Sequence, residues 1–211
     1  MKKMMLKNNF YKIFALLLFT VLINSCGIEY THEQQNYISS IQKMRVEKDD
    51  YMKNDPNSPF NYDSNAVFNP LKYFNVDPSF VFKSKLYEYE KKDTVEIFGT
   101  LGEARKTIIF GYVKFNYDEK DYKINVYRGQ TKKGDIYHSI WFTDKTTNDE
   151  TYGVGRYLDF ELNSDENFIY TIDFNLVYNP YCAYSAKYSC AIPTKKDYIN
   201  LEIKVGEKKF H

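Results

Sequence analysis

The sequence predicts a mainly β fold: a single antiparallel β-sandwich or barrel-like domain, preceded by one N-terminal α-helix and a Pro/Asn-rich loop. The first observation is a series of seven or more short segments, from Phe80 onward, in which apolar and polar residues alternate between turn residues. The second is that Phe, Tyr and Trp make up 18% of the chain, because aromatic side chains favour strands. The third is that no helical stretch long enough for a parallel crossover lies between these segments.

The first 25 residues have the features of an export signal. Basic residues precede the apolar run Ile13–Ile23, which is too short to span a bilayer, and Ser25-Cys26 follows it. This order is similar to the bacterial lipoprotein cleavage box, which implies that residues 1–25 are a lipoprotein signal peptide and that Cys26 is lipidated, for example by palmitate. An ordinary signal peptide, or an anchor with an incidental cysteine, is the alternative. We expect a tether over residues 26–31 and a single β-rich domain with an N-terminal helix over residues 32–208.

The net charge and the expected lipid anchor limit which classes of partner this protein can have. Removal of residues 1–25 leaves 25 basic against 28 acidic residues, a formal charge of −3, and such a balance gives no footprint for nucleic acid. We expect a protein of the bacterial cell envelope that is lipid-anchored to the membrane on the periplasmic side or the outer surface. Its partners are then the membrane, through the lipid, and a small-molecule, glycan or protein ligand.

One helix precedes the strands. Apolar residues at three- and four-residue steps predict a helix from His32 to Lys53, and Asp55-Pro56 ends it because the residue before proline avoids the helical region. Residues 55–79 contain four of the six prolines together with many Asn, Asp and Ser residues, which is typical of loops and turns.

The remaining segments read as strands. Residues 107–117 and 122–128 predict a hairpin, with a bulge near Gly111–Tyr112 where the apolar phase shifts. Alternation of apolar and polar residues predicts further strands at residues 80–89, 95–97, 136–143, 156–162, 168–177 and 198–205.

Few residues offer catalytic or metal-binding chemistry. His138 is the only histidine in the strand region, and its alternation with apolar neighbours favours packing over catalysis. Residues 144–150 offer oxygen atoms at calcium-loop spacing, but the expected glycine is Asp149, so we interpret them as a polar turn. We expect no metal site and no cofactor.

Cys182 and Cys190 are the two cysteines left after lipidation of Cys26. Their spacing and the lack of a nearby histidine do not fit a zinc site. In an exported protein such a pair is a candidate disulfide. A pair of packed thiols is the alternative.

Polar side chains are concentrated between residues 150 and 190. Arg156 could bind an anion, or it could form a structural ion pair with Asp159, Asp173 or Glu207. The full set of candidate binding residues is Tyr152, Arg156, Asp159, Asp173, Asn175, Asn179 and Tyr184.

Several longer segments resemble an uncharacterised bacterial family, the domain of unknown function 1684. The residues that carry the resemblance are Arg45–Asp49, Asn57–Pro59, Leu71–Phe74, Glu150–Asp159, Asp173–Asn175, Tyr178–Tyr184, Cys190, Pro193, Asn200-Leu201 and Val205–Lys208. This chain departs from the family pattern at Val177, commonly alanine, and in Cys190-Ala191-Ile192-Pro193, where one proline of the family's usual run is missing. The resemblance implies no established activity. It also implies that the cysteine pair occurs in relatives that resemble cytosolic proteins, so both alternatives for the pair stay open.

Two function classes follow. One is an envelope lipoprotein with a ligand- or partner-binding β-domain. The other is an enzyme of unknown type with a polar site built from residues 150–190, and its catalytic residues are unknown. Convergence of Arg156, Asp173, Asn175 and Tyr184 in one solvent-open pocket would favour the enzyme. Burial of these residues against one another would make them structural.

Overall fold

The computed structural model describes residues 29–131 and 134–211. The predicted signal peptide, Cys26 and the first residues of the predicted tether lie outside the described residues. The chain divides into two units, residues 1–35 and 36–211. The first contributes residues 29–35, which contain the start of α2 (His32–Asn54), and all other helices and strands of the described residues lie in the second.

The predicted N-terminal helix is confirmed as α2 (His32–Asn54). Only Ile41 and Met52 of this helix are buried. A second helix, α3 (Pro59–Tyr62), lies in the predicted loop and is capped by Ser58, whose side chain accepts a hydrogen bond from the Asn61 N–H. Short 3₁₀ turns occur at η1 (Pro78–Phe80), η2 (Phe174–Leu176), η3 (Tyr181–Ala183) and η4 (Lys195–Asp197).

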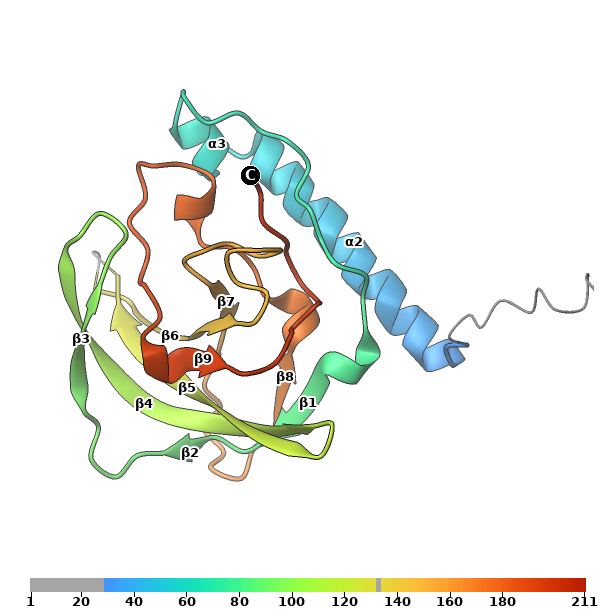
Figure 1. Cartoon of the computed structure of the whole chain (residues 1–211), viewed down its shortest axis with the longest axis vertical. Coiled ribbons are helices and arrows are strands. Elements are labelled where there is room, and N and C mark those ends of the chain that lie inside the picture. The colour runs from blue at the N-terminus through green and yellow to red at the C-terminus, as the bar shows by residue number, and fades with distance from the viewer. Residues whose placement is uncertain (1–28, 132–133) are drawn as a thin grey trace, which may run out of the picture. The chain divides into compact units, whose positions relative to one another are not determined.

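Nine strands follow α3 in the described residues. They are β1 (Val81–Ser84), β2 (Tyr87–Glu88), β3 (Thr94–Phe98), β4 (Ala104–Tyr117), β5 (Lys120–Gln130), β6 (Ile136–Asp144), β7 (Arg156–Asp159), β8 (Tyr170–Asp173) and β9 (Tyr198–Ile199). A seven-stranded sheet has the order β2-β4-β5-β6-β7, with β3 on β4 and β9 on β6, and β1 pairs with β8 separately. Figure 1 shows the long β4–β5 hairpin curving around the molecule while α2 runs along another side.

The hairpin and its bulge are confirmed. The register between β4 and β5 shifts between Ile109 and Gly111, so Phe110 is the extra residue. Gly111 is required there because a Cβ atom would lie 2.6 Å from the backbone oxygen of Tyr87 on β2. The bulge therefore lets β2 approach the longest strand.

The predicted strands at the C-terminal side are shorter than expected. The strand predicted over 168–177 ends at Asp173, because the Asp173 carboxylate accepts the Asn175 N–H and starts η2. The strand predicted over 198–205 is the two-residue β9, which pairs with β6 in parallel, whereas all other paired strands are antiparallel. The segment after β9 is held by a side chain instead, as described below.

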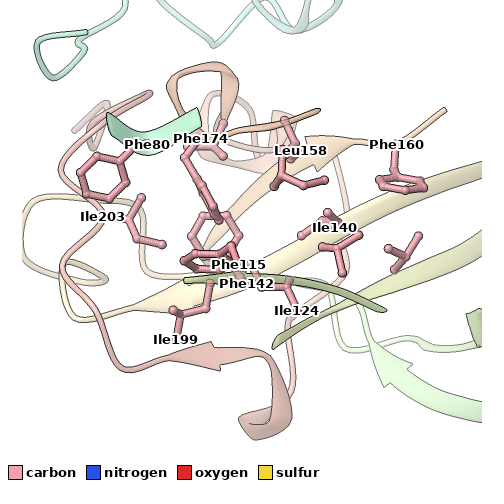
Figure 2. Packing of buried hydrophobic residues seen from close by; sticks show 14 of the residues in the cluster. Phe80, Phe115, Ile124, Ile140, Phe142, Leu158, Phe160, Phe174, Ile199 and Ile203 are labelled. Atoms are coloured by element: carbon pink, nitrogen blue, oxygen red, sulfur yellow. The ribbon is translucent and has the colours of Figure 1, made fainter. Parts of the chain in front are cut away.

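The main core lies against one face of β4–β7. Figure 2 shows Phe174 packed on Phe115 and Phe142 of the large sheet, with Ile124 and Ile140 in the same cluster. Trp141 points to the opposite face and packs in another cluster with Ile97, Tyr127 and Ala191. Strand β6 is therefore buried on both faces, which explains its run of apolar residues.

The mainly β class, the N-terminal helix and the antiparallel sheets are confirmed. The strands of the described residues form no closed barrel, so that part of the expectation is wrong, because β2, β3, β7 and β9 are too short to close the large sheet. The β-sandwich stays a prediction.

Candidate functional site

Arg156 is a buried cation whose guanidinium group donates hydrogen bonds to backbone carbonyls that a neighbouring strand would otherwise pair. Its side chain is 1% exposed. Nη2 donates to Asp144 Oδ2 at 2.8 Å and to Ile203 O at 2.7 Å, and Nη1 donates to Val205 O at 2.5 Å. The predicted ion pair is correct in kind, but its partner is Asp144. The carbonyl groups after β9 are thus satisfied by a guanidinium.

The residue before Arg156, Gly155, allows the backbone to place the arginine in this position. Gly155 has φ +92°, and a Cβ atom there would lie 2.3 Å from Phe142 O. The Asp144 carboxylate also accepts the Thr146 N–H and hydroxyl, so the 144–150 segment is a turn closed by protein donors. The polar-turn interpretation fits this geometry.

Glu207 is a second buried charge, 1% exposed at its side chain. Lys48 Nζ donates to Oε1 at 2.5 Å, and the Asn179 N–H and Tyr184 hydroxyl donate to Oε2 at 2.8 and 2.5 Å. Burial, together with the Glu207 charge, raises the pKa of Tyr184, because the ionised phenol would face a carboxylate. Asn179 and Tyr184 therefore position Glu207.

Asp173 and Asn175 connect the helix to the sheet. The Asp173 carboxylate accepts a hydrogen bond from the Tyr37 hydroxyl at 2.8 Å and two more from the backbone N–H and the side-chain amide of Asn175. The Asn175 side chain forms two hydrogen bonds with the backbone of Asp77. Asp173 and Asn175 are buried and are used structurally.

The cysteines are free thiols in this structure. The Cys182 N–H donates to Cys190 Sγ at 3.2 Å, and Tyr152 donates to the Cys182 carbonyl at 3.2 Å. The hydrogen bond from Cys190 lowers the pKa of Cys182 to about 7, and the same pairing raises the pKa of Cys190. Two thiols so close could be oxidised together, and the disulfide stays a prediction.

Arg156, Asp173, Asn175 and Tyr184 do not share one solvent-open pocket. All four are buried. Arg156 holds the C-terminal segment, and Tyr184 holds Glu207. The sequence thus located the polar framework of the molecule rather than an exposed site.

A groove lined by aromatic side chains lies beside this framework. Its volume is about 690 Å³. The aromatic residues that line it are Tyr51, Tyr137, Trp141, Tyr157, Tyr178, Tyr181 and Tyr188, and Arg105, Lys48, Asp159, Ser139 and Ser189 add polar groups. We name this hollow the aromatic groove.

Trp141 forms a buried part of the aromatic groove and is 3% exposed. It stacks on Tyr127 with ring centroids 4.6 Å apart and ring planes 9° apart. The Tyr127 hydroxyl in turn donates to the buried carboxylate of Asp197 at 2.8 Å. The indole is therefore held rigidly.

Strand pairing and loop contacts assemble the rest of the aromatic groove. β6 and β7 pair Trp141 with Tyr157. Tyr188 comes from the loop between the cysteines, which is tied to the β3–β4 turn by the hydrogen bond from the Thr100 N–H to Cys190 O at 3.0 Å. Tyr51 of α2 lies 3.3 Å from Tyr181, hydroxyl to hydroxyl.

A smaller cavity of about 340 Å³ lies under α2. Its polar lining residues are Arg45, Lys48, Tyr73, Asp159, Asn175 and Glu207, and we name it the Arg45 cavity. Lys48, Asp159 and Tyr178 line both hollows, so the two share a wall. Tyr178 donates to Asp159 Oδ1 at 2.6 Å in this wall.

Of the predicted site residues, only Asp159, Asn175 and Cys190 line these hollows. Sequence reasoning missed Arg45, Lys48, Tyr73 and Trp141. The aromatic content was a general signal for the groove, but no spacing identified which rings meet.

Neither a metal-binding cluster nor a membrane-spanning helix occurs in residues 29–131 and 134–211. There, no group of three or more His, Cys, Asp or Glu side chains is arranged to hold a metal ion. Nor does any helix in those ranges combine the length and apolar character that crossing a membrane requires.

The sequence matches the family model described as "Protein of unknown function (DUF1684)" over residues 66–208. The chain belongs to the DUF1684 family. The matched range contains the segments at 150–159 and 173–184 that suggested the family, whereas Arg45 and the rest of α2 lie before it. Membership therefore covers the sheet and the groove-forming loops.

A solved structure also resembles this DUF1684 member. The solution NMR structure of an uncharacterized protein of Haloarcula marismortui is 24% identical, with a TM-score of 0.59, over 83% of this chain and 96% of that chain. At this identity the likeness concerns the fold alone. No curated protein matches the chain.

The buried pair predicts a strong effect on stability. Asp144→Ala leaves the Arg156 guanidinium buried without its carboxylate, and we expect a loss of about 3–5 kcal/mol in the free energy of unfolding. Urea denaturation of the full-length protein measures this loss. Lys43→Ala, which breaks an exposed pair with Glu47 on α2, is the control and should cost about 0.5 kcal/mol or less. Equal effects of the two variants would contradict the role of Arg156.

The thiol pair predicts a pH dependence. Because the pKa of Cys182 is lowered to about 7, its thiolate is present above that pH, and alkylation by iodoacetamide should reach half its maximal rate near pH 7. Peptide mass spectrometry separates Cys182 from the other cysteines. Cys190→Ala removes the hydrogen bond and should move the midpoint upward. An unchanged midpoint in this variant would show that Cys190 does not stabilise the thiolate.

Proposed function

We propose that this protein binds a glycan in the aromatic groove, and that it does so as a lipid-anchored component of the bacterial cell envelope on a sandwich-type β-scaffold. The single observation that carries the binding proposal is the convergence of seven aromatic side chains on one groove of about 690 Å³. Trp141 is buried at the base of the groove, whereas the six tyrosines are exposed or half-buried and offer ring surface on a concave face.

The chemistry of the groove favours a sugar. The C–H faces of sugar rings pack on aromatic rings, and their hydroxyl groups need polar partners at the rim. Tyr137 and Tyr51 are 39% and 37% exposed and so offer ring surface to a ligand. Asp159 and Arg105 supply an acceptor and donors among these rings.

The size of the surface favours a chain of sugars. A second hollow of about 1100 Å³ shares Arg105, Tyr137, Trp141 and Tyr188 with the aromatic groove. The two together extend the contact surface along one side of the large sheet. A single small molecule would leave most of this surface unused.

Support for the envelope location comes from the sequence. Basic residues, a short apolar run and Ser25-Cys26 occur in the order that lipoprotein export requires. A lipid on Cys26 would tether the binding domain near the glycans of the cell surface. A single acyl chain binds a membrane weakly, so stable anchoring needs more than one chain.

The enzyme alternative loses its strongest support. Arg156, Asp173 and Tyr184 are occupied by protein partners. A catalytic site would have to use groups that the aromatic groove exposes, and His138 is not among its lining residues. Binding therefore accounts for the groove with fewer assumptions.

Trp141 is the only tryptophan in the chain, so its fluorescence reports directly on the groove. Titration of the full-length protein with cello-, malto- and chito-oligosaccharides and with oligogalacturonates should change the emission for at least one series. Tyr188→Ala removes a groove ring and should weaken that binding about tenfold, or about 1.4 kcal/mol. Tyr198→Ala, on an exposed tyrosine of β9 that lines neither hollow, is the matched control. No response to any series, or equal losses in both variants, would overturn the glycan proposal.

The anchor is tested separately. Cells expressing the wild-type chain should incorporate radiolabelled palmitate into it and retain it in the membrane fraction. Cys26→Ser should abolish the label and release the protein from membranes. A Cys182→Ser variant is the control and should keep the label. Label retained in Cys26→Ser would exclude Cys26 as the lipid attachment site.

A further inference from the structure

Arg45 has buried donors without partners in the described part of the chain. Its Nη1 donates to the Phe74 carbonyl at 2.8 Å, but Nε and Nη2 are buried and make no hydrogen bond with any described residue. Each unsatisfied buried donor costs about 1–3 kcal/mol, more for a charged group. A buried group of this kind requires an explanation, and a molecule that binds there is one.

Two nearby carboxylates, Glu207 and Asp173, do not offset this cost, because they accept hydrogen bonds from other groups and not from Nε or Nη2 of Arg45. Glu207 accepts hydrogen bonds from Lys48, Asn179 and Tyr184. Asp173 accepts them from Tyr37 and Asn175. Burial lowers the pKa of Arg45 by more than the charges of Glu207 and Asp173 raise it, which agrees with a cation that makes no ion-pair contact.

The surroundings of Arg45 are shaped for a planar group. The guanidinium carbon lies 4.5 Å from the centre of the Tyr73 ring, which covers one face of the fork. The Tyr73 hydroxyl is also buried and makes no hydrogen bond of normal geometry with a described residue, although Glu207 lies close enough to add to the rise in its pKa that burial causes. Nε and Nη2 form the side-on fork that binds the two oxygens of a carboxylate. A phenolic donor beside the fork would add a third hydrogen bond.

The charges that line the Arg45 cavity favour a ligand with one negative charge over a ligand with two. Two cations line it, Arg45 and Lys48, and two acids, Glu207 and Asp159. Lys48 and Glu207 neutralise each other at 2.5 Å, which leaves Arg45 inside and Asp159 at the wall shared with the aromatic groove. A doubly charged phosphate would have to enter between Glu207 and Asp159, so a carboxylate suits the cavity better.

We propose that the Arg45 cavity is a carboxylate subsite, and that the glycan bound in the aromatic groove carries a uronic acid. This inference rests on the proposed function, and it names the chemical class of the ligand. The carboxylate binds Arg45 and Tyr73, while Asp159 and Tyr178 in the shared wall contact the sugar ring.

A pair of probes of the same shape tests the subsite. Glucuronate and its methyl ester are titrated into the full-length protein, and Trp141 fluorescence gives both affinities. We expect glucuronate to bind at least tenfold more tightly than the uncharged ester. The Nε–H signal of Arg45 in a ¹⁵N spectrum should shift with glucuronate and stay in place with the ester.

Variants separate the subsite from the groove. Arg45→Met should remove the preference for glucuronate and leave the affinity for the ester unchanged, while Arg45→Lys, which keeps the charge but not the fork, should lose most of it. Lys43→Met, on an exposed lysine of the same helix, should keep the preference. Tyr188→Ala should weaken both probes equally. The fluorescence midpoint of urea unfolding checks that each variant folds.

The outcomes distinguish the two proposals. Equal binding of glucuronate and ester by the wild type, or a preference that survives in Arg45→Met, overturns the carboxylate subsite and leaves the glycan groove intact. A glucuronate-induced shift at Arg45 without any effect of Tyr188→Ala overturns the groove and supports the subsite. If Arg45→Met does not fold, the wild-type preference and Arg45→Lys decide the matter.

Discussion

The structure depends on the guanidinium group of Arg156. β9 contributes only two residues to the sheet, yet the chain beyond it fills the core with Ile203 and Val205. An extended segment without a neighbouring strand would leave its carbonyl groups unpaired in that core. Arg156, neutralised by Asp144, satisfies them and so makes a core without a complete strand possible.

That clamp also fixes the position of Glu207. Gly206 has φ +72° and no room for a side chain, because a Cβ atom would lie 2.7 Å from Val177 O. The turn it allows directs Glu207 toward Lys48 of α2. Since α2 buries so little apolar surface, such polar contacts decide where it lies. The aromatic groove and the Arg45 cavity exist because α2 is held there.

Local pattern was enough to predict α2 and the β4–β5 hairpin, because helix periodicity, alternation and turn residues act over short distances. It could not predict that Asp144, assigned to a polar turn, is the partner of Arg156, since Asp159, Asp173 and Glu207 were equally reasonable partners. Nor could it assemble the groove. Tyr51, Trp141 and Tyr188 come from a helix, a strand and a loop, and only the tertiary fold brings them together.

The contact between Lys48 and Glu207 spans 159 residues of sequence, and this has a consequence for the order of assembly. Synthesis proceeds from the N-terminus, so α2 is made well before its acceptor. During that interval the helix has little apolar surface with which to attach elsewhere. The Arg45 cavity, which Lys48 and Glu207 both line, is therefore completed only after Glu207 has been made and has reached α2.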